Sequence, residues 1–300
     1  MPDESDVVTE ARNERTRDLD LLPVLEQTRL MNEEERRVSE AVAATLPQIA
    51  AAVTRIAEAL RRGGRLLYVG AGTSGRLATL DAAECPPTFG TRPEQVQAVI
   101  AGGSRALCEA VEGAEDDAAA GGLEMDARGV GPSDVVVGIA ASGETPFVLG
   151  ALRRARQRGA ATIAVACAPR SSLESACDLA IVPLVGPEVL MGSTRLKAGT
   201  AQKQVLNMLS TLVMVQLGRV YGNLMVYLQA TNAKLRRRAV RIVTAATGAP
   251  DDAAAGALSR AQGRVPVAIV MLLRRVSAEE ADARLRRASG NVRRALQETP

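Results

Sequence analysis

Apolar positions recur with two different periods along this chain. Up to about residue 62 they recur every three to four residues, as in LPQIAAAVTRIAEAL, and this period predicts amphipathic helices. Asn32 and Glu35 have the spacing of a capping box and predict a helix start, while Gly63-Gly64 predicts the end of the helical region. Five short apolar runs that predict strands follow at 65–69, 96–100, 134–140, 161–167 and 178–184.

Helical patterns such as FVLGALRRARQRG separate most of the five runs. Apolar strands that alternate with helices are typical of an α/β fold, in which helices cover both faces of a parallel sheet. In such sheets the ligand binds at the carboxyl ends of the strands. The polar, glycine-containing loops after the first and third runs are therefore the candidate binding loops.

The last third of the chain changes from strands to helices. A long helix is predicted from about Ser193 to Leu217, and its apolar stretch VLNMLSTLVMVQL is too short and too interrupted to cross a membrane. TGAPDDAAAGA has the composition of a linker, and three short helical patterns follow it, with boundaries near Gly263 and Ser289-Gly290. We expect an N-terminal helical segment at 1–55, an α/β domain at 56–225 and a small C-terminal helical module at 226–300.

The composition restricts the chemistry. The 300 residues are 47% hydrophobic, which is typical of a globular protein, and the formal net charge of +3 indicates neither nucleic acid nor a membrane as a partner. The chain has no histidine, so a general acid or base must be a carboxylate, lysine, tyrosine or cysteine. Without imidazole ligands or zinc-type cysteine spacing, we expect no metal and no cofactor.

Two further features indicate the compartment. The four cysteines form no C-x-x-C pair, and we expect buried free thiols in a reducing environment. The N-terminal stretch MPDESDVVTE is acidic and polar, unlike a signal peptide. We therefore expect a cytoplasmic protein.

The stretch YVGAGTSGR follows the first predicted strand and places Gly70, Gly72 and Gly75 at the spacing of a dinucleotide fingerprint. A dinucleotide site also needs an acidic residue at the end of the second strand, and that strand ends here in AGGS. A phosphate monoester suits the loop better, because turn N–H groups and the dipole of the next helix favour a small anion. Gly72, Thr73 and Ser74 are the predicted ligands, and Ser74 is also a candidate N-cap of that helix.

The loop ASGETP, after the third predicted strand, has similar chemistry. It offers the hydroxyls of Ser142 and Thr145 and the flexible Gly143. Two hydroxyl-rich loops at the ends of neighbouring strands favour the binding of one phosphosugar between them. Ordinary polar turns are the alternative interpretation.

A third stretch, GSTRLKAGTAQK, contains two of the three lysines of the chain. Ser193 or Thr194 is a candidate N-cap of the long predicted helix, whose start favours an anion. Ser193 and Lys197 are therefore candidate ligands of the phosphosugar. A solvated helix start is the alternative.

Four runs together resemble one known family: GAGTSGRLATLDAAECPPTFG, AGGSRALCEAVEGAEDD, GIAASGETP and GPEVLMGSTRLKAGTAQKQVLNMLST. They are similar to the N-acetylmuramic acid 6-phosphate etherases, bacterial enzymes with the sugar isomerase (SIS) fold, and the similarity covers most of the chain. The resemblance implies cleavage of the lactyl ether at C3 of N-acetylmuramic acid 6-phosphate, to give N-acetylglucosamine 6-phosphate and D-lactate. It also implies an elimination followed by addition of water, with Glu84 and Glu115 as the acid and the base.

The local sequence bears on these two roles. Pro86-Pro87 predicts that the helix after the first strand stops at about Glu84, and a helix C-terminus favours a protonated carboxyl, as an acid requires. Glu115 belongs to an acidic run of five carboxylates, which alone would indicate a solvated acidic face. The choice of Glu115 from this run comes from the resemblance.

A straight helix would separate Glu84 from Ser74 by about 15 Å, because the two residues are ten positions apart. That separation exceeds the reach of one hexose phosphate held at Ser74. Either the helix breaks early, or Glu84 serves the site of a second subunit. We favour a homodimer with shared active sites, which the resemblance also implies.

Three residues differ from the pattern of the resembled family. Glu144 stands where arginine is usual, Met191 where threonine is usual and Tyr227 where aspartate is usual. A carboxylate at 144 weakens anion binding if it points into the site, but not if it points outward or pairs with an arginine.

Three other functions compete with the etherase. A sugar-phosphate sensor on the same fold would keep the phosphate loops but would not need an acid–base pair. A nucleic-acid-binding regulator would use the basic stretch KLRRRAVR, although arginines on one helix face are more often solvated. A sugar isomerase fits the fold but not the run DAAECPP. Retention of both Glu84 and Glu115 favours the enzyme with a small phosphosugar substrate and no nucleic-acid or membrane partner.

Overall fold

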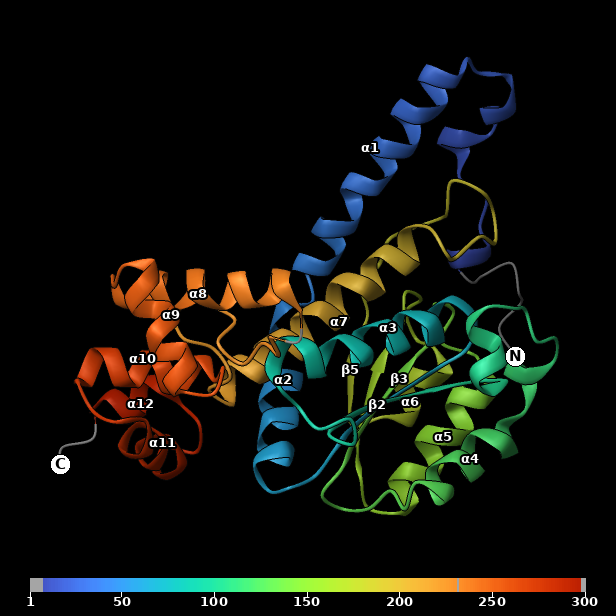
Figure 1. Cartoon of the computed structure of the whole chain (residues 1–300). Helices are drawn as coiled ribbons and strands as arrows, with labels where there is room; N and C mark the ends of the chain where they lie inside the picture. The colour runs from blue at the N-terminus through green and yellow to red at the C-terminus, as the bar shows by residue number, and fades with distance from the viewer. Residues whose placement is uncertain (1–7, 231, 298–300) are drawn as a thin grey trace. The chain divides into compact units, whose positions relative to one another are not determined.

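The computed structural model describes residues 8–230 and 232–297 (Figure 1). Most of the acidic stretch that argued against a signal peptide, residues 1–7, lies outside the described residues. The chain divides into two compact units, Met1–Ala83 with Glu94–Ser210, and Glu84–Pro93 with Thr211–Pro300. The predicted segment 1–55 thus falls in the same unit as most of the α/β domain.

The first unit contains a five-stranded sheet in the order β2-β1-β3-β4-β5, and every neighbouring pair is parallel. All five predicted strands are confirmed: β1 (Leu66–Gly70), β2 (Val96–Ile100), β3 (Val135–Ile139), β4 (Ala161–Val165) and β5 (Leu179–Ile181). Strands β1 and β3 are buried along their whole length. Their sequences are therefore apolar at every position instead of alternating between apolar and polar.

Helices cover both faces of this sheet, as the alternation of strands and helices predicts (Figure 1). On one face, α4 (Ala118–Ala127) and α5 (Pro146–Gln157) form a core with Leu67 and Val69 of β1. Helix α2 (Leu46–Arg61) contacts β3 and β5. The other elements that begin in this unit are η2 (Val8–Glu10), η3 (Glu14–Thr16), η4 (Leu19–Leu21), α1 (Val24–Ala43), α3 (Gly72–Phe89), η5 (Gly103–Leu107), η6 (Ala114–Asp116), α6 (Ser172–Ala176) and α7 (Lys197–Gln216).

The predicted helix start at Asn32 is wrong. Asn32 lies inside α1, which begins at Val24 directly after Pro23. Proline with its fixed φ can supply a helix start without a capping side chain, so the capping-box spacing of Asn32 and Glu35 has no such role here. The predicted end at Gly63-Gly64 is confirmed, because α2 ends at Arg61.

The predicted end of α3 at about Glu84 is also wrong. Helix α3 continues to Phe89 with Pro86 and Pro87 inside it. The φ angle of proline is compatible with a helix, and what the two prolines remove is the N–H that would bond to the carbonyl four residues earlier. Glu84 therefore does not lie at a helix C-terminus, and the argument that a helix end keeps its carboxyl protonated does not apply.

The second unit is a bundle of short helices around its own apolar core. Its helices are α8 (Ala233–Thr247), α9 (Asp251–Arg260), α10 (Val265–Arg274), α11 (Ala278–Arg287) and α12 (Val292–Gln297). The linker expected at TGAPDDAAAGA is wrong, because α9 forms from most of it. Gly248 ends α8 with a φ of 72°, and Pro250 precedes α9 as its N-cap residue.

The predicted boundaries near Gly263 and Ser289-Gly290 are confirmed, since they separate α9 from α10 and α11 from α12. The single helical pattern predicted between these two boundaries forms two helices, α10 and α11. Arg275 ends α10 with a φ of 55°, and the Ser277 side chain caps α11 by accepting a hydrogen bond from Glu280 N–H. The hydrophobic pattern does not reveal that Arg275 adopts a left-handed backbone conformation, so the sequence did not predict the break between α10 and α11.

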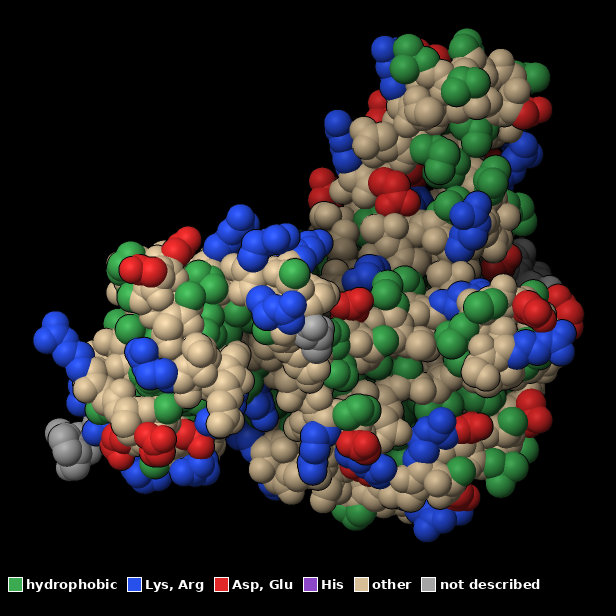
Figure 2. All heavy atoms as spheres, in the orientation of Figure 1, with side chains coloured by type: hydrophobic (Ala, Val, Ile, Leu, Met, Phe, Trp, Pro, Cys, Tyr) green, Lys and Arg blue, Asp and Glu red, His purple; other side chains and the backbone are tan. Residues whose placement is uncertain are grey.

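Two surface properties bear on partners. Within residues 8–230 and 232–297, no helix is long and apolar enough to cross a membrane. Figure 2 shows Lys and Arg side chains gathered over α8. The exposed basic residues of this helix are Lys234, Arg236, Arg237, Arg238 and Arg241.

The cysteines are free thiols, as expected, but only Cys85 and Cys167 are buried. Cys108 is exposed and Cys177 is partly exposed, so the expectation of four buried thiols is wrong for these two. Burial, together with the negative charge of Glu188, raises the pKa of Cys167 to about 12. Cys167 is therefore a neutral core thiol at physiological pH.

Candidate functional site

The first unit has a cavity of about 430 Å³, lined by residues that follow β1 and β3 at their carboxyl ends. From β1 the chain passes through α3 to β2, which lies next to β1 toward one edge of the sheet. From β3 it passes through α5 to β4, which lies next to β3 toward the opposite edge. This is the topological switch point, where open α/β sheets bind their ligands. The two candidate loops identified in the sequence therefore line one cavity.

The glycines of the β1–α3 turn allow the helix to lie close to the sheet. A Cβ on Gly70 would lie 2.7 Å from Gly75 N, and a Cβ on Gly75 would lie 2.5 Å from Ile100 Cγ1. Neither position can hold a side chain unless α3 moves away from β1 and β2. Gly72 has a φ of 50°, a left-handed conformation that favours glycine.

The start of α3 presents unbonded donors to the cavity. The first helical hydrogen bond of α3 runs from the N–H of Gly75 to the carbonyl oxygen of Ala71, four residues earlier, over 3.1 Å. The N–H groups of Gly72, Thr73 and Ser74 have no acceptor within the helix, and all three residues line the cavity. Such a helix start is well suited to bind a phosphate.

Ser74 lies in the first turn of α3 and is not its N-cap, so that expectation is wrong. Its hydroxyl donates to Oε1 of Gln202 on α7 over 2.9 Å. Both side chains are buried, with Gln202 only 1% exposed. Gln202 thus holds the Ser74 side chain at the cavity wall.

The β3–α5 loop supplies two hydroxyls to the same cavity, from Ser142 and Thr145. The Ser142 oxygen accepts a hydrogen bond from Glu144 N–H over 3.2 Å, and the Thr145 hydroxyl forms no capping bond to α5. Gly143 does not line the cavity, but its φ is 73° and a Cβ there would lie 2.3 Å from Ser171 Oγ. Gly143 is required by the shape of the loop.

Four carboxylates also line the cavity. Glu10 comes from η2, Glu115 and Asp116 from η6, and Glu144 from the β3–α5 loop. An oxygen of the Glu144 carboxylate accepts a hydrogen bond from Ser172 N–H over 2.7 Å. Glu144 therefore lines the cavity while its carboxylate is held at the start of α6, and no arginine among the described residues forms an ion pair with it.

The start of α7 is capped by neither Ser193 nor Thr194, which corrects the expectation. The carboxylate of Glu188 accepts the N–H groups of Lys197 over 3.0 Å and Ala198 over 2.9 Å. Burial raises the pKa of Glu188 and outweighs these two hydrogen bonds and the charge of Lys197. Thr194 lines the cavity, whereas Ser193 is not among the lining residues.

Lys197 is buried in the first unit and does not line the cavity. Its ammonium lies 2.6 Å from the carboxylate of Glu34 on α1, and both side chains are at most 1% exposed. Arg15 and Asn13 also bond to the Glu34 carboxylate. The burial of Glu34 raises its pKa, but the bonds and charge of Lys197, with Asn13 and Arg37, outweigh this effect and lower the pKa. This position does not support Lys197 as a phosphate ligand.

The two glutamates assigned by resemblance have different positions. Glu115 lines the cavity. Glu84 lies ten residues beyond Ser74 on an unbroken α3 and is not among the lining residues. Of the other two residues that differ from the resembled pattern, Met191 is exposed and Tyr227 belongs to the second unit.

Four residues at the site were not predicted as site residues from the sequence: Glu10, Asp116, Thr194 and Gln202. Thr194 was considered only as a helix cap, and Asp116 could not be separated from its acidic neighbours. Glu10 and Gln202 reach the site from segments far away in the sequence. Gln202 lies within GSTRLKAGTAQK, and its place in this candidate stretch is the signal that could have identified it.

Comparison with known proteins covers most of the chain. Residues 48–156 match the family described as glucokinase regulatory protein N-terminal SIS domain, and residues 116–212 match the SIS domain family. The chain is 56% identical over 293 residues to the N-acetylmuramic acid 6-phosphate etherase of Rubrobacter xylanophilus, which covers 98% of this chain and 97% of that protein. It is 55% identical over 294 residues to the enzyme of the same name from Mycolicibacterium smegmatis, covering 98% of this chain and 99% of that protein.

A solved structure supports the fold. The phosphoheptose isomerase of Francisella tularensis is similar with a TM-score of 0.51 and 18% sequence identity, covering 65% of this chain and 100% of that one. At this identity the likeness concerns the fold alone. The predicted α/β fold of SIS type, with helices on both sides of a parallel sheet, is confirmed.

Proposed function

We infer that this chain, which belongs to the N-acetylmuramic acid 6-phosphate etherase family, is a carbon–oxygen lyase with the activity of that family. It cleaves the C3 lactyl ether of N-acetylmuramic acid 6-phosphate and releases D-lactate and N-acetylglucosamine 6-phosphate. We also propose roles for individual residues of the site. The observation that carries them is that Glu115 lines the same cavity as the donor groups after β1 and β3.

The phosphate of the substrate binds at the start of α3. Among the described lining residues there is no Lys or Arg, so the donors are backbone N–H groups and hydroxyls. Thr73 and Ser74 supply both kinds of donor, and Ser142, Thr145 and Thr194 add further hydroxyls to the cavity. Ser193 and Lys197, also predicted as ligands, are not among the residues that line the cavity.

Glu115 acts as the base. In the open-chain sugar the C2–H is acidified by the C1 aldehyde, and a carboxylate beside it can take that proton. The electron pair left at C2 forms a C2–C3 double bond while the C3–O bond breaks, and lactate leaves after its ether oxygen receives a proton. Water then adds at C3, and a proton returns to C2, which gives N-acetylglucosamine 6-phosphate.

A pair of neighbouring carboxylates allows a sharp test of the base. Glu115 and Asp116 both belong to η6 and both line the cavity. We expect Glu115→Gln to lower D-lactate release by about 10²- to 10⁴-fold, the usual contribution of a general base, and Asp116→Asn to retain most activity. If both variants were equally active, Glu115 would not be the base. A wild type that binds the phosphosugar but releases no lactate would indicate a sensor instead.

Glu84 is the proposed acid, and its position on α3 favours action in a second subunit. The early helix break that would have brought it nearer to Ser74 does not occur, because α3 continues through Pro86 and Pro87. We therefore propose a homodimer with shared active sites, in the reducing cytoplasm that the free thiols favour. Mixing inactive Glu84→Gln and Glu115→Gln proteins would restore activity through heterodimers. Absence of recovery after verified subunit exchange would contradict shared sites.

A further inference from the structure

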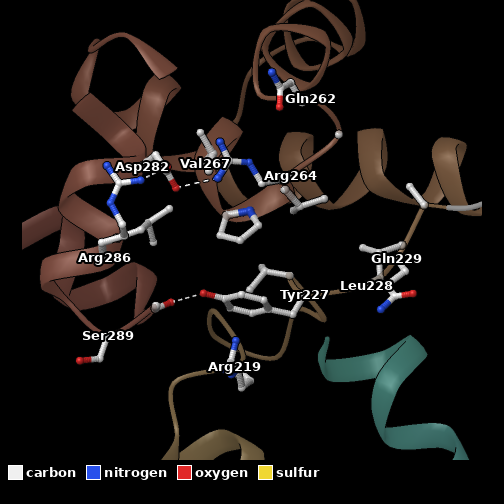
Figure 3. Close-up of a pocket in the computed structure, with 17 residues that line it drawn as sticks. Arg219, Tyr227, Leu228, Gln229, Gln262, Arg264, Val267, Asp282, Arg286 and Ser289 are labelled. Carbon is white, nitrogen blue, oxygen red and sulfur yellow. Dashed lines mark hydrogen bonds and ion pairs between the residues drawn. The ribbon is translucent and has the colours of Figure 1, made fainter. Parts of the chain in front are cut away.

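The second unit contains a cavity of its own, with a volume of about 530 Å³ (Figure 3). It is lined by the segment before α8, by the α9–α10 turn and by α11 with its C-terminal turn. The volume lies within the usual range of small-molecule sites. None of the catalytic or phosphate-binding residues proposed above lines it.

One wall of this cavity is an aromatic ring fixed in place. The Tyr227 hydroxyl donates a hydrogen bond to Gly290 O over 2.6 Å. A Cβ on Gly290 would lie 2.6 Å from the same hydroxyl oxygen, so this position has to be glycine for the contact to form. Buried Pro266 and Leu285 extend the apolar lining beside the ring.

The polar part of the lining is strongly basic. The Asp282 carboxylate accepts from Arg264 over 2.7 Å and forms a second ion pair with Arg286. The guanidinium of Arg219 lies 4.7 Å from the centre of the Tyr227 ring and forms no ion pair with any described residue. The lining thus holds three arginines and one carboxylate, which leaves two positive charges among the described lining residues uncompensated.

Figure 3 shows how these groups are arranged. The Arg219 side chain lies on one side of the Tyr227 ring, while Arg264, Asp282 and Arg286 lie on the other side. The arginines come from three separate segments and all line the cavity, with the Tyr227 ring between Arg219 and the other two. A ligand within it can therefore contact guanidinium groups and an apolar wall at the same time.

We propose that this cavity is a second ligand site, which binds a phosphate monoester whose organic part is a small apolar ring. A phosphate monoester carries a charge of about −1.5 to −2 at neutral pH, which matches the uncompensated charge of the lining. Guanidinium groups bind phosphate oxygens through paired, charge-assisted hydrogen bonds. The ring of the ligand packs against Tyr227 and its apolar neighbours, which favours an aryl group over a polar sugar.

Phenyl phosphate is the simplest probe of this chemistry. Titration calorimetry on the full-length protein is expected to show saturable binding, tighter than that of phenol or of inorganic phosphate alone. An Arg219→Met, Arg286→Gln double variant should bind at least about tenfold more weakly, because two charged donors are lost. Arg286 is exposed, so Arg286→Gln alone gives a folded variant with a smaller loss if the double variant does not fold.

Two controls separate this site from other anion sites. Arg293 stacks on Tyr221 at 5.3 Å in the same unit but does not line the cavity, so Arg293→Met should leave the affinity unchanged. Ser74→Ala should leave the binding that depends on Arg219 and Arg286 unchanged, because Ser74 belongs to the cavity at the strand ends, where we propose that a phosphate monoester binds separately. Equal binding by wild type and the double variant, or a loss of binding in Ser74→Ala alone, would overturn the proposal. So would an absence of saturable binding to wild type.

Discussion

The hydroxyl of Ser74 donates to Oε1 of Gln202 over 2.9 Å, while Nε2 of the same amide is buried and has no hydrogen-bond partner among the described residues. A half turn of the amide would let Nε2 donate to the Ser74 oxygen. The Ser74 proton would then be free to donate to a phosphate oxygen of the substrate. Gln202 is thus placed to orient the hydroxyl that we propose as a phosphate ligand, although Gln202 itself does not line the cavity.

We expect Gln202→Leu to raise KM about fivefold with little change in kcat, because the Ser74 hydroxyl loses the partner that orients it and its hydrogen bond to the phosphate weakens by about 1 kcal/mol. Gln202→Glu should raise KM further, because a carboxylate only accepts and holds the Ser74 proton away from the substrate. Steady-state kinetics of D-lactate release measure both effects.

The matched control for these variants is Gln204, which is also on α7. Its amide donates to Ser39 Oγ over 3.4 Å, and it does not line the cavity. Gln204→Leu should leave KM unchanged. A KM in Gln202→Glu no higher than in Gln202→Leu would show that the amide does not set the direction of the Ser74 proton.

A second prediction concerns the buried ion pair of Lys197 and Glu34. Lys197→Met leaves the Glu34 carboxylate buried with Arg15 as its main cationic partner, and we expect a loss of about 3–5 kcal/mol in the free energy of unfolding. Glu34→Gln combined with Lys197→Met should recover part of that loss, because no buried charge remains uncompensated. Urea denaturation of the single and double variants measures this coupling.

The same double variant tests whether Lys197 binds phosphate. If Lys197 is purely structural, the partly stabilised double variant should have a KM close to that of the wild type. If Lys197 contacts the substrate, the KM of the double variant should stay at least about tenfold above that of the wild type, since a charge-assisted hydrogen bond is missing. A KM that stays high in a stable double variant would contradict the structural role.

The sequence predicted the sheet better than the surroundings of the cavity. Strands β1 and β3 are buried on both faces, so their continuous apolar runs could be recognised without tertiary information. The loops after them follow from the same reasoning, because parallel strands bring their carboxyl ends to one edge. Ser74, Ser142 and Thr145 therefore lie at one cavity, as their positions after the strands suggested.

What the sequence did not predict depends on contacts between distant segments. Lys197 looked like an anion ligand at a helix start, but Glu34, 163 positions earlier, binds it in the interior. Glu188 displaced the expected hydroxyl caps of α7 from only nine positions before Lys197, a distance that a capping rule limited to the residues next to the helix start does not cover. In α3, the local rule that proline ends a helix failed, since the helix continues through Pro86 and Pro87 although neither has a backbone N–H.

A third prediction concerns the pH dependence of stability through Asp134. The burial of Asp134 raises its pKa, but hydrogen bonds from the Arg65 side chain and from the N–H groups of Gly131 and Arg65 outweigh this, so the pKa lies below the ordinary 3.8. A lowered carboxyl pKa contributes stability that is fully present above the unfolded-state value and is lost as the pH falls through the folded-state value. Asp134→Asn should cost about 1–3 kcal/mol at pH 7 and progressively less below pH 4.

Unfolding free energies of wild type and Asp134→Asn between pH 3 and pH 7 measure this difference. Asp126 is the control, because it forms ion pairs with Arg154 and Arg158 at the surface, where solvent weakens them. Asp126→Asn should have a clearly smaller effect at pH 7. A difference between wild type and Asp134→Asn that stays constant down to pH 3 would mean that the Asp134 pKa is not what carries the pH dependence.

The last prediction concerns Glu144, a carboxylate at the wall of the cavity in which we propose that the substrate phosphate binds. Glu144→Gln keeps an oxygen that can accept from Ser172 N–H and removes only the charge, so the loop should keep its shape. We expect KM to fall about two- to fivefold at low ionic strength, because one repulsion of order 1 kcal/mol is removed, and the gain should shrink toward physiological salt. Glu174 is the matched control, since its carboxylate accepts from Arg170 N–H over 2.7 Å outside the cavity lining. An equal fall of KM in Glu174→Gln would indicate a general charge effect, whereas an unchanged KM in Glu144→Gln would mean that the Ser172 contact already keeps this charge away from the bound phosphate.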